Sequence, residues 1–304
     1  MPGIPDMIGL LVLLVLSPLY MGIAQRVKAR CQGRHGPGWT QPYWRLGKTW
    51  HKETTVPEFT SWVFRVAPAV SLAALLLVLA SVPVAGAGPA GWPDDVLTVF
   101  FLLAVERFWV GLAGLDAAGA FGGLGASRVA TLGAGVEPAL LAAFGILFGL
   151  RNQTVIVPLA ARVLALPLGP LPWALAVVSY GMVVLAEAGR LPVDNPDTHL
   201  ELTMMHEAAV LEYNGRLLAL SEVAAGVKLT ALLALGWVWL GPHWASPWDN
   251  LATVLTGVAA SVAALGAVES RFVKLRYFQL PGYVTIAAGI GTLALYLAVS
   301  GGIR

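Results

Sequence analysis

The chain has 304 residues, of which 57% are hydrophobic and only 12% charged, and its formal net charge is +2. A soluble domain normally carries about 25% charged residues, so this composition excludes an ordinary soluble enzyme and places the protein in a membrane. Backbone amides have no water partners in hydrocarbon, and the apolar runs are long rather than alternating. The sequence therefore predicts an all-α polytopic membrane protein.

Runs of about 20 apolar residues predict about eight transmembrane helices. In chain order they cover approximately 5–23, 64–85, 96–115, 136–150, 171–187, 217–240, 251–268 and 281–300. The first run is similar to a signal peptide, but its start lacks Lys and Arg, and no small-residue cleavage site precedes the basic stretch that follows. We expect it to stay in the mature chain.

The positions of Lys and Arg predict the orientation, because these residues favour cytoplasmic connections. Residues 24–63 form an amphipathic basic loop, and the connection after the seventh run is also basic. Both loops are expected on the cytoplasmic side of the membrane, which puts both termini on the outer side. The acidic loop 187–216, between the fifth and sixth predicted helices, is then cytoplasmic, and we treat 1–304 as a single membrane domain.

In the basic loop, four aromatic residues alternate with three basic ones after a Gly-Pro-rich start, which is typical of a short helix lying in the membrane interface. These residues are Trp39, Tyr43, Trp44, Trp50, Arg45, Lys48 and Lys52. Topology control explains most of this charge, and a docking surface or an entry portal could also be built there. Nucleic-acid binding is not expected, because an inner membrane face demands the same pattern.

The acidic loop begins a further predicted helix. Asn195 is a good N-cap and Pro196 suits the first helical position, so the helix is expected to run to about Tyr213, before Gly215 ends it.

On this predicted helix Asp197, Glu201 and Glu212 fall within about 60° of one another, with Glu207 to one side. A solvated cytoplasmic face would explain these acids. The other residues of the helix are largely apolar, however, so we expect it to pack against something. Buried carboxylates placed close together raise one another's pKa, and with water between them they can pass protons.

Charged residues also occur within or at the ends of the predicted spans, where they are costly unless they face a bundle interior, a partner or water. They are Glu106, Arg107, Asp116, Glu137, Glu187, Glu222 and Lys228. Ion pairs that fix helix packing would account for them, with Glu106 beside Arg107 and Glu222 beside Lys228 as expected pairs.

Metal chemistry in this chain is not expected. Cys31 is the only cysteine, so the chain alone can hold no disulfide and no iron–sulfur cluster. His206-Glu207 does not begin a zinc-protease motif, because Val210 stands where the second histidine would be. His199 lies two helical turns from His206, about 10.5 Å, which is too far for one shared metal.

A series of motifs resembles one family of membrane proteins. It is the membrane component shared by group 4 nickel–iron hydrogenases, by formate hydrogenlyase, as its subunit 4, and by NADH–quinone oxidoreductase (complex I), as its H subunit. The motifs are QGRHGP at 32–37, GLD at 114–116, FGG at 121–123, GASR at 125–128, EP at 137–138, EAGRLPVDNP at 187–196, HLELTM at 199–204, HE at 206–207, EYNG at 212–215, ES at 269–270 and KLR at 274–276. They occur in a consistent order over almost the whole chain.

The acidic run resembles the hydrogenase branch, because HLELT at 199–203 followed by AAVLEY at 208–213 is less dense in acids than the quinone-reducing branch. Two positions depart from the hydrogenase pattern. Val129 stands where relatives usually carry Glu, and Asn214 replaces the common Ser. The first puts one carboxylate of the path in doubt.

The resemblance implies a non-catalytic, membrane-anchoring subunit that couples redox events to proton or ion movement in the inner membrane of a prokaryote. The partners it implies are a nickel–iron large subunit, a cluster-bearing small subunit, antiporter-like membrane subunits and lipid. The nickel–iron centre and the iron–sulfur clusters would sit in those partners, with no cofactor in this chain.

The resemblance also implies residue roles. The proton or ion path would use Glu187, Asp194, Asp197, Glu201, Glu207, Glu212 and Glu222. Arg190 and Lys228 would balance charge, and Gln32, Arg34, Arg45, Lys48 and Lys52 would dock the soluble arm.

Two other functions compete with this one. A quinone-site subunit of an NADH–quinone oxidoreductase-type complex would use the same scaffold with a lipid-accessible cavity beside the basic loop. A stand-alone carrier is disfavoured, because neither an inverted repeat nor paired broken helices are evident.

Overall fold

The computed structural model describes residues 4–86, 95–151, 156, 170–194 and 204–302, and the elements formed by these residues are all helical. In chain order they are α1 (Ile4–Cys31), α2 (Gln41–Trp50), α3 (Trp62–Ala80), α4 (Val96–Asp116), α5 (Ala120–Arg151), α7 (Pro170–Glu187), α8 (His206–Ala209), α9 (Gly215–Leu240), α10 (Pro247–Glu269), the 3-10 turn η1 (Tyr277–Gln279) and α11 (Leu280–Gly302).

Within the described residues, seven helices are long and apolar enough to cross a membrane: α1, α3, α4, α7, α9, α10 and α11, the last counted together with η1. The fourth predicted run lies inside α5, which begins at Ala120 rather than near Val136. α1 likewise continues to Cys31, beyond the expected end near Ile23. The all-helical membrane class is thus confirmed, while the total of about eight spans stays a prediction.

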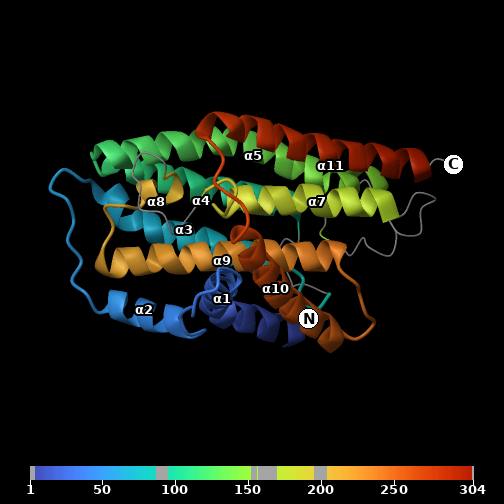
Figure 1. Ribbon diagram of the computed structural model, residues 1–304, viewed down its shortest axis with the longest axis horizontal. Coiled ribbons are helices and arrows are strands. Elements are labelled where there is room, and N and C mark those ends of the chain that lie inside the picture. The colour runs from blue at the N-terminus through green and yellow to red at the C-terminus, as the bar shows by residue number, and fades with distance from the viewer. Residues whose placement is uncertain (1–3, 87–94, 152–155, 157–169, 195–203, 303–304) are drawn as a thin grey trace.

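The long helices run alongside one another (Figure 1), with both ends of the described chain at one end of the bundle and α2 and α8 toward the other. We call the end with α2 and α8 the polar end. The two termini therefore lie on the same side, as expected, and their outward orientation stays a prediction. α2 itself confirms the short helix predicted in the basic loop.

Helix α9 lies at the centre of the bundle. Of its most apolar 18-residue window, 72% is buried, against 28–44% for the other six spans. Trp239 on α9 is fully buried and packs on Phe144 of α5 and Tyr180 of α7, with ring centroids 4.7 and 5.5 Å away. An added Cβ at Gly236 would lie 2.7 Å from the Tyr180 ring, so glycine is what allows α7 and α9 to approach this closely.

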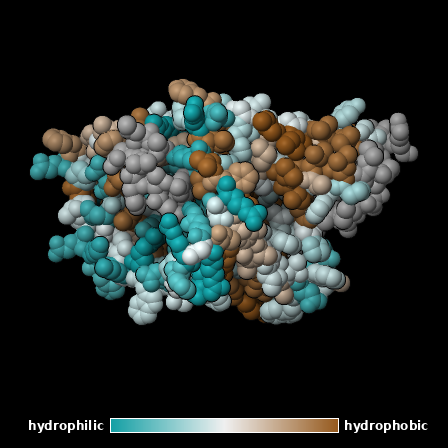
Figure 2. All heavy atoms as spheres, viewed as in Figure 1, coloured by the Kyte–Doolittle hydropathy of each residue, from teal (hydrophilic) through white to brown (hydrophobic). Residues whose placement is uncertain are grey.

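The surface of the bundle has a hydrophilic part and a hydrophobic part. Hydrophilic residues gather over the polar end in Figure 2, whereas hydrophobic residues gather over α7 and α11 toward the other end. Because charged side chains are costly in hydrocarbon, the apolar part is the surface suited to lipid and the polar end is the surface suited to water.

The aromatic contact of α9 should be a main source of stability. We expect Trp239→Ala to lower the free energy of unfolding by about 3–5 kcal/mol, because a large buried ring is removed and the cavity cannot fully collapse. Thermal unfolding of the detergent-solubilised protein measures this change. Trp244→Ala, at a ring that is 53% exposed, is the control. Equal effects of the two substitutions would contradict the central role of α9.

Candidate functional site

A cavity of about 500 Å³ opens among α1, α3, α4, α7 and α9, with α2, α8 and the 188–194 connection around its mouth. We call it the polar cavity. Its ionisable lining residues are Arg45, Glu106, Glu187, Arg190, Asp194, His206, Glu207, Tyr213, Glu222 and Lys228. Side chains from distant parts of the sequence are thereby brought to one internal surface.

Glu187, the last residue of α7, is the centre of a buried ion-pair network. Arg107 Nη2 donates to Glu187 Oε2 at 2.7 Å, and Lys228 Nζ lies 2.9 Å from Oε1 in an orientation that does not form a hydrogen bond. Arg107 also reaches Glu137 at 2.5 Å, and Lys228 reaches Glu106 at 2.8 Å. When all are ionised, three carboxylates share two cations, which leaves one negative charge in excess.

A second pair holds the turn after α7. Arg190 lies 3.4 Å from Glu269 at the end of α10, and Lys28 of α1 lies 3.5 Å from the same carboxylate. The turn itself requires Gly189, which has φ +59° and sits so close to His206 that an added Cβ would lie 2.7 Å from Nδ1. The 188–194 connection is therefore fixed against α1, α8 and α10.

Asp194 forms the third cluster. Its Oδ1 accepts from Lys274 Nζ at 2.6 Å, and its Oδ2 accepts from the backbone amides of Met205 and His206 at 3.2 and 3.1 Å. Burial alone would raise the pKa of Asp194, but hydrogen bonds and charge from His206 and Lys274 outweigh it and hold that pKa well below its usual range. Asp194 therefore stays ionised.

At the mouth of the cavity α2 meets α9. Arg45 Nε lies 3.3 Å from Glu222 Oε2, with the Arg45 side chain 53% exposed and that of Glu222 22% exposed. Such a solvated pair contributes little stability. The position of this pair matters more, because it brings α2 directly over the polar cavity.

The two ion pairs expected from sequence are wrong. Glu106 pairs with Lys228 rather than with Arg107, and Glu222 pairs with Arg45 rather than with Lys228. Neighbours on a helix point about 100° apart, and residues six apart are separated by about 9 Å along the axis, so neither expected pair lies on one face.

The prediction of one continuous helix from Asn195 to Tyr213 is also wrong for residues 204–213, which the structure describes. Residues 195–203, with Asp197, Glu201 and the expected N-cap, lie outside the described residues. Beyond them the only helix before α9 is the four-residue α8. Asp194 binds the amides at the start of α8, which places the short helix there.

After α8 the chain turns instead of continuing as a helix. The Tyr213 hydroxyl donates to Phe64 O at 2.9 Å, and burial raises the Tyr213 pKa, which keeps the hydroxyl a donor. Gly215, with φ +52°, completes the turn into α9. These contacts between α3 and the chain after α8 outweigh the helix propensity of that segment.

The structure brings together most of the predicted site residues that it describes. Glu187, Asp194, Glu207, Glu222, Arg190 and Lys228 line the polar cavity. Glu212 does not, because it is exposed and lies near Gly119. Of the predicted docking residues, Arg45 reaches the cavity, while Gln32, Arg34, Lys48 and Lys52 are exposed.

The predicted site missed several members of the clusters: Lys28, Glu106, Arg107, Glu137, His206, Glu269 and Lys274. The sequence did indicate that Glu106, Arg107 and Glu137 face the interior of the bundle, because charged residues within or beside an apolar run are costly in lipid. Their partners could not be read from sequence, because each pair joins different helices.

Within the part of the chain that the structure describes, no group of three His, Cys, Asp or Glu side chains is arranged to hold a metal ion. The absence of any cofactor from this chain stays a prediction.

Comparison with known proteins places this geometry in context. A family profile described as NADH dehydrogenase matches residues 6–299. Hydrogenase-4 component C of Escherichia coli (strain K12) is 30% identical over 286 residues, covering 90% of each chain. Formate hydrogenlyase subunit 4 of the same organism is 31% identical over 302 residues, covering 95% of this chain and 96% of that one.

Among solved structures, a chain of the membrane-bound sulfane sulfur reductase, an archaeal respiratory membrane complex, superposes with a TM-score of 0.81. The match covers 97% of this chain and 98% of that one at 19% identity. At that identity the likeness establishes the fold alone.

Removal of the central carboxylate should be costly. We expect Glu187→Gln to lower the free energy of unfolding by about 1.5–3 kcal/mol, because Arg107 and Lys228 each lose one buried carboxylate contact while they keep Glu137 and Glu106. Thermal unfolding of Glu187→Gln, Lys228→Gln and the double variant tests the pairing. The double variant should cost less than the sum of the two single variants. Glu58→Gln, at an exposed position, is the control. Simple additivity would contradict the ion pair.

The lowered pKa of Asp194 predicts a pH dependence. A carboxylate whose folded pKa is lowered stabilises the protein above its unfolded pKa of about 3.9, and this contribution is lost as pH falls below that value. The protection factors of the amides in residues 188–194 and 204–209, each referred to the intrinsic exchange rate at the same pH, should therefore stay high at pH 5 and fall below about pH 4. Asp194→Asn should already exchange fast at pH 5. An unchanged acid dependence in that variant would contradict the role of Asp194.

Proposed function

We propose that this chain, which belongs to the NADH dehydrogenase family, is the membrane-anchoring, ion-coupling subunit of a complex I-like nickel–iron hydrogenase. Two relatives support the hydrogenase branch. Each is at least 30% identical over 90% or more of both chains, and their names are those of a hydrogenase component and a formate hydrogenlyase subunit.

The observation that carries the proposal is the buried network of Glu187 beside the polar cavity. Three carboxylates balanced by two cations hold one excess negative charge, so a proton can be accepted there without creating a net positive charge. A redox event in a docked partner changes the local field, and in a low-dielectric interior such a change acts strongly on protonation. The network is therefore suited to coupling electron transfer to proton movement.

Water is the natural carrier between the mouth and this network. Ser71 Oγ, which lines the polar cavity, lacks a hydrogen-bond partner, and Glu187 Oε1 and Glu222 Oε2 contact Lys228 and Arg45 as ion pairs without hydrogen-bond geometry. Unsatisfied buried oxygens facing a roomy polar cavity are suitable partners for ordered water. We propose a path from Glu222 at the mouth, through this water, to Glu187.

From Glu187 the charge network extends to Glu106 and to Glu137, whose side chain is 35% exposed on α5. Glu137 is a suitable exit toward a neighbouring antiporter-like subunit. Glu207, with Asp197 and Glu201, remains a proposed member of the entrance, and Asp194, which stays ionised, would contribute negative charge there. Glu212 fits this path less well, because it is exposed and does not line the cavity.

The surface for the soluble arm would be the basic loop with α2. Gln32, Arg34, Lys48 and Lys52 are exposed there, and Arg45 links α2 to the cavity. We propose that the nickel–iron large subunit and the cluster-bearing small subunit dock over this surface and contain the metal centres.

A quinone-site subunit remains the second candidate. The polar cavity, at about 500 Å³, falls within the size range of small-molecule sites. The two curated relatives favour the hydrogenase-type complex over this alternative.

Purification of the tagged full-length chain from membranes should bring down subunits containing nickel and iron. The variant Glu222→Gln should keep that metal content, because the solvated pair with Arg45 adds little stability. It should reduce ion movement coupled to hydrogen turnover by roughly tenfold or more, since a group that relays protons is lost. Metal analysis and a proton-sensitive dye in proteoliposomes measure the two effects.

Glu58→Gln is the matched control, because Glu58 is exposed and outside the cavity. Copurified subunits with iron but no nickel, together with quinone reduction, would overturn the proposal in favour of the second candidate. Unchanged ion movement in Glu222→Gln would remove Glu222 from the path.

A further inference from the structure

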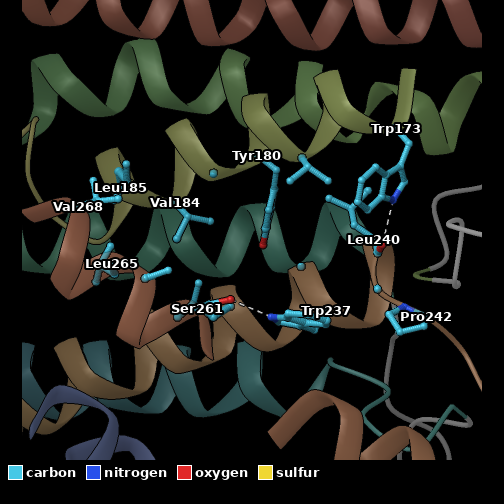
Figure 3. Close-up of a pocket in the computed structure, with 16 residues that line it drawn as sticks. Trp173, Tyr180, Val184, Leu185, Trp237, Leu240, Pro242, Ser261, Leu265 and Val268 are labelled. Atoms are coloured by element: carbon cyan, nitrogen blue, oxygen red, sulfur yellow. Dashed lines mark hydrogen bonds between the residues drawn. The ribbon is translucent and has the colours of Figure 1, made fainter. Parts of the chain in front are cut away.

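A second cavity, of about 520 Å³, lies between α7, α9 and α10, and on α9 it is lined by residues farther along the helix than those that line the polar cavity. We call it the apolar groove. In Figure 3 its side chains converge from α7 on one side and from α9 and α10 on the other. Val177 and Val268 on its rim are 37% and 36% exposed, so the groove opens onto the outer surface of the bundle.

The walls of the apolar groove offer nothing to a polar ligand. Its four polar side chains all take part in hydrogen bonds within the protein. Trp173 Nε1 donates to Leu240 O at 2.9 Å, Tyr180 OH donates to Leu232 O at 2.7 Å, and Trp237 Nε1 donates to Ser261 Oγ at 2.8 Å. The remaining lining residues are Val, Leu, Ala, Gly and Pro. An occupant of this groove must therefore be hydrocarbon.

The length of the groove matches that of one lipid acyl chain from one leaflet of the bilayer. The groove follows α7 from Trp173 to Leu185, which is about 18 Å along a helix axis. Half of a ~30 Å hydrocarbon core is about 15 Å. The groove is therefore long enough to hold one extended acyl chain.

Positive charge stands at one end of the groove. Its lining ends at Val268 and Leu185. The chain turns immediately beyond, where the Arg271 amide donates to Val268 O at 2.9 Å. Arg271 and Arg276 of this connection are both exposed. Lys274, by contrast, is engaged by Asp194. Two exposed guanidinium groups beside the end of a hydrocarbon groove complement an anionic headgroup.

We propose that the apolar groove binds one acyl chain of an anionic phospholipid, with the phosphate placed at the α10–α11 connection beside Arg271. The lipid comes from the leaflet on that side. Bulk lipid is as apolar as the groove, so chain burial alone gives no preference over the surrounding bilayer. Arg271 and Arg276 supply the preference for an anionic headgroup, and the groove fixes the position of the acyl chain.

The test uses the full-length chain with the subunits that copurify with it, placed in phosphatidylcholine nanodiscs. The probe is phosphatidylglycerol with a photoreactive diazirine in one acyl chain. We expect crosslinks on peptides of α7, α9 and α10 that line the groove. Unlabelled phosphatidylglycerol should compete with the probe better than added phosphatidylcholine does.

Two variants separate the chain site from the headgroup site. An added Cβ at Gly181 meets no atom within 4 Å, so Gly181→Leu should fill the groove without a clash and remove most of the crosslinking. Gly289→Leu is the matched control, because Gly289 of α11 is equally open and lies outside the groove. Arg271→Gln should weaken the preference for phosphatidylglycerol by about fivefold, as expected for the loss of one basic residue near an anionic group.

Three results would overturn the proposal. Equal crosslinking in Gly181→Leu and wild type would place the lipid elsewhere. An unchanged headgroup preference in Arg271→Gln combined with Arg276→Gln would remove the electrostatic half of the site. Crosslinks to a partner subunit in place of the groove peptides would assign the groove to a protein contact.

Discussion

The cost of placing charge inside a membrane protein controls the architecture around Glu187. Its carboxylate is held between Arg107 of α4 and Lys228 of α9, and those cations in turn bind Glu137 and Glu106. Removing water from such groups costs several kcal/mol per ion unless partners replace it. Four helices are consequently tied together at one level of the bundle, and a set of titratable groups is kept in the interior.

The central helix α9 borders two kinds of internal space, at different heights along its length. Toward α2 and α8 it presents Glu222 and Lys228 to the polar cavity, where unsatisfied oxygens suit water. Toward α7 and α10 it presents Trp237 and Leu240 to a groove whose polar atoms are already bonded. One helix thus supports a path suited to protons and, apart from it, a surface suited to lipid.

The helices could be predicted from the sequence far better than the site. Apolar runs located every long helix, because a spanning helix needs about 20 apolar residues whatever its neighbours are. The extended start of α5 was missed because residues 120–135 contain many glycines, whose cost in a helix is offset here by close contacts such as Gly125 with Ala208. The ion pairs were missed because they depend on which helices are adjacent. Glu106 and Lys228 are 122 residues apart in the chain.

The Asp194 cluster joins two loops that the sequence keeps far apart. Lys274 and Asp194 are 80 residues apart, and beside them the Leu275 amide donates to Pro192 O at 2.8 Å. The 188–194 connection and the α10–α11 connection are therefore held against each other at these two contacts. Because Asp194 also accepts from the Met205 and His206 amides, a partner that displaces the α10–α11 connection would displace the start of α8 with it.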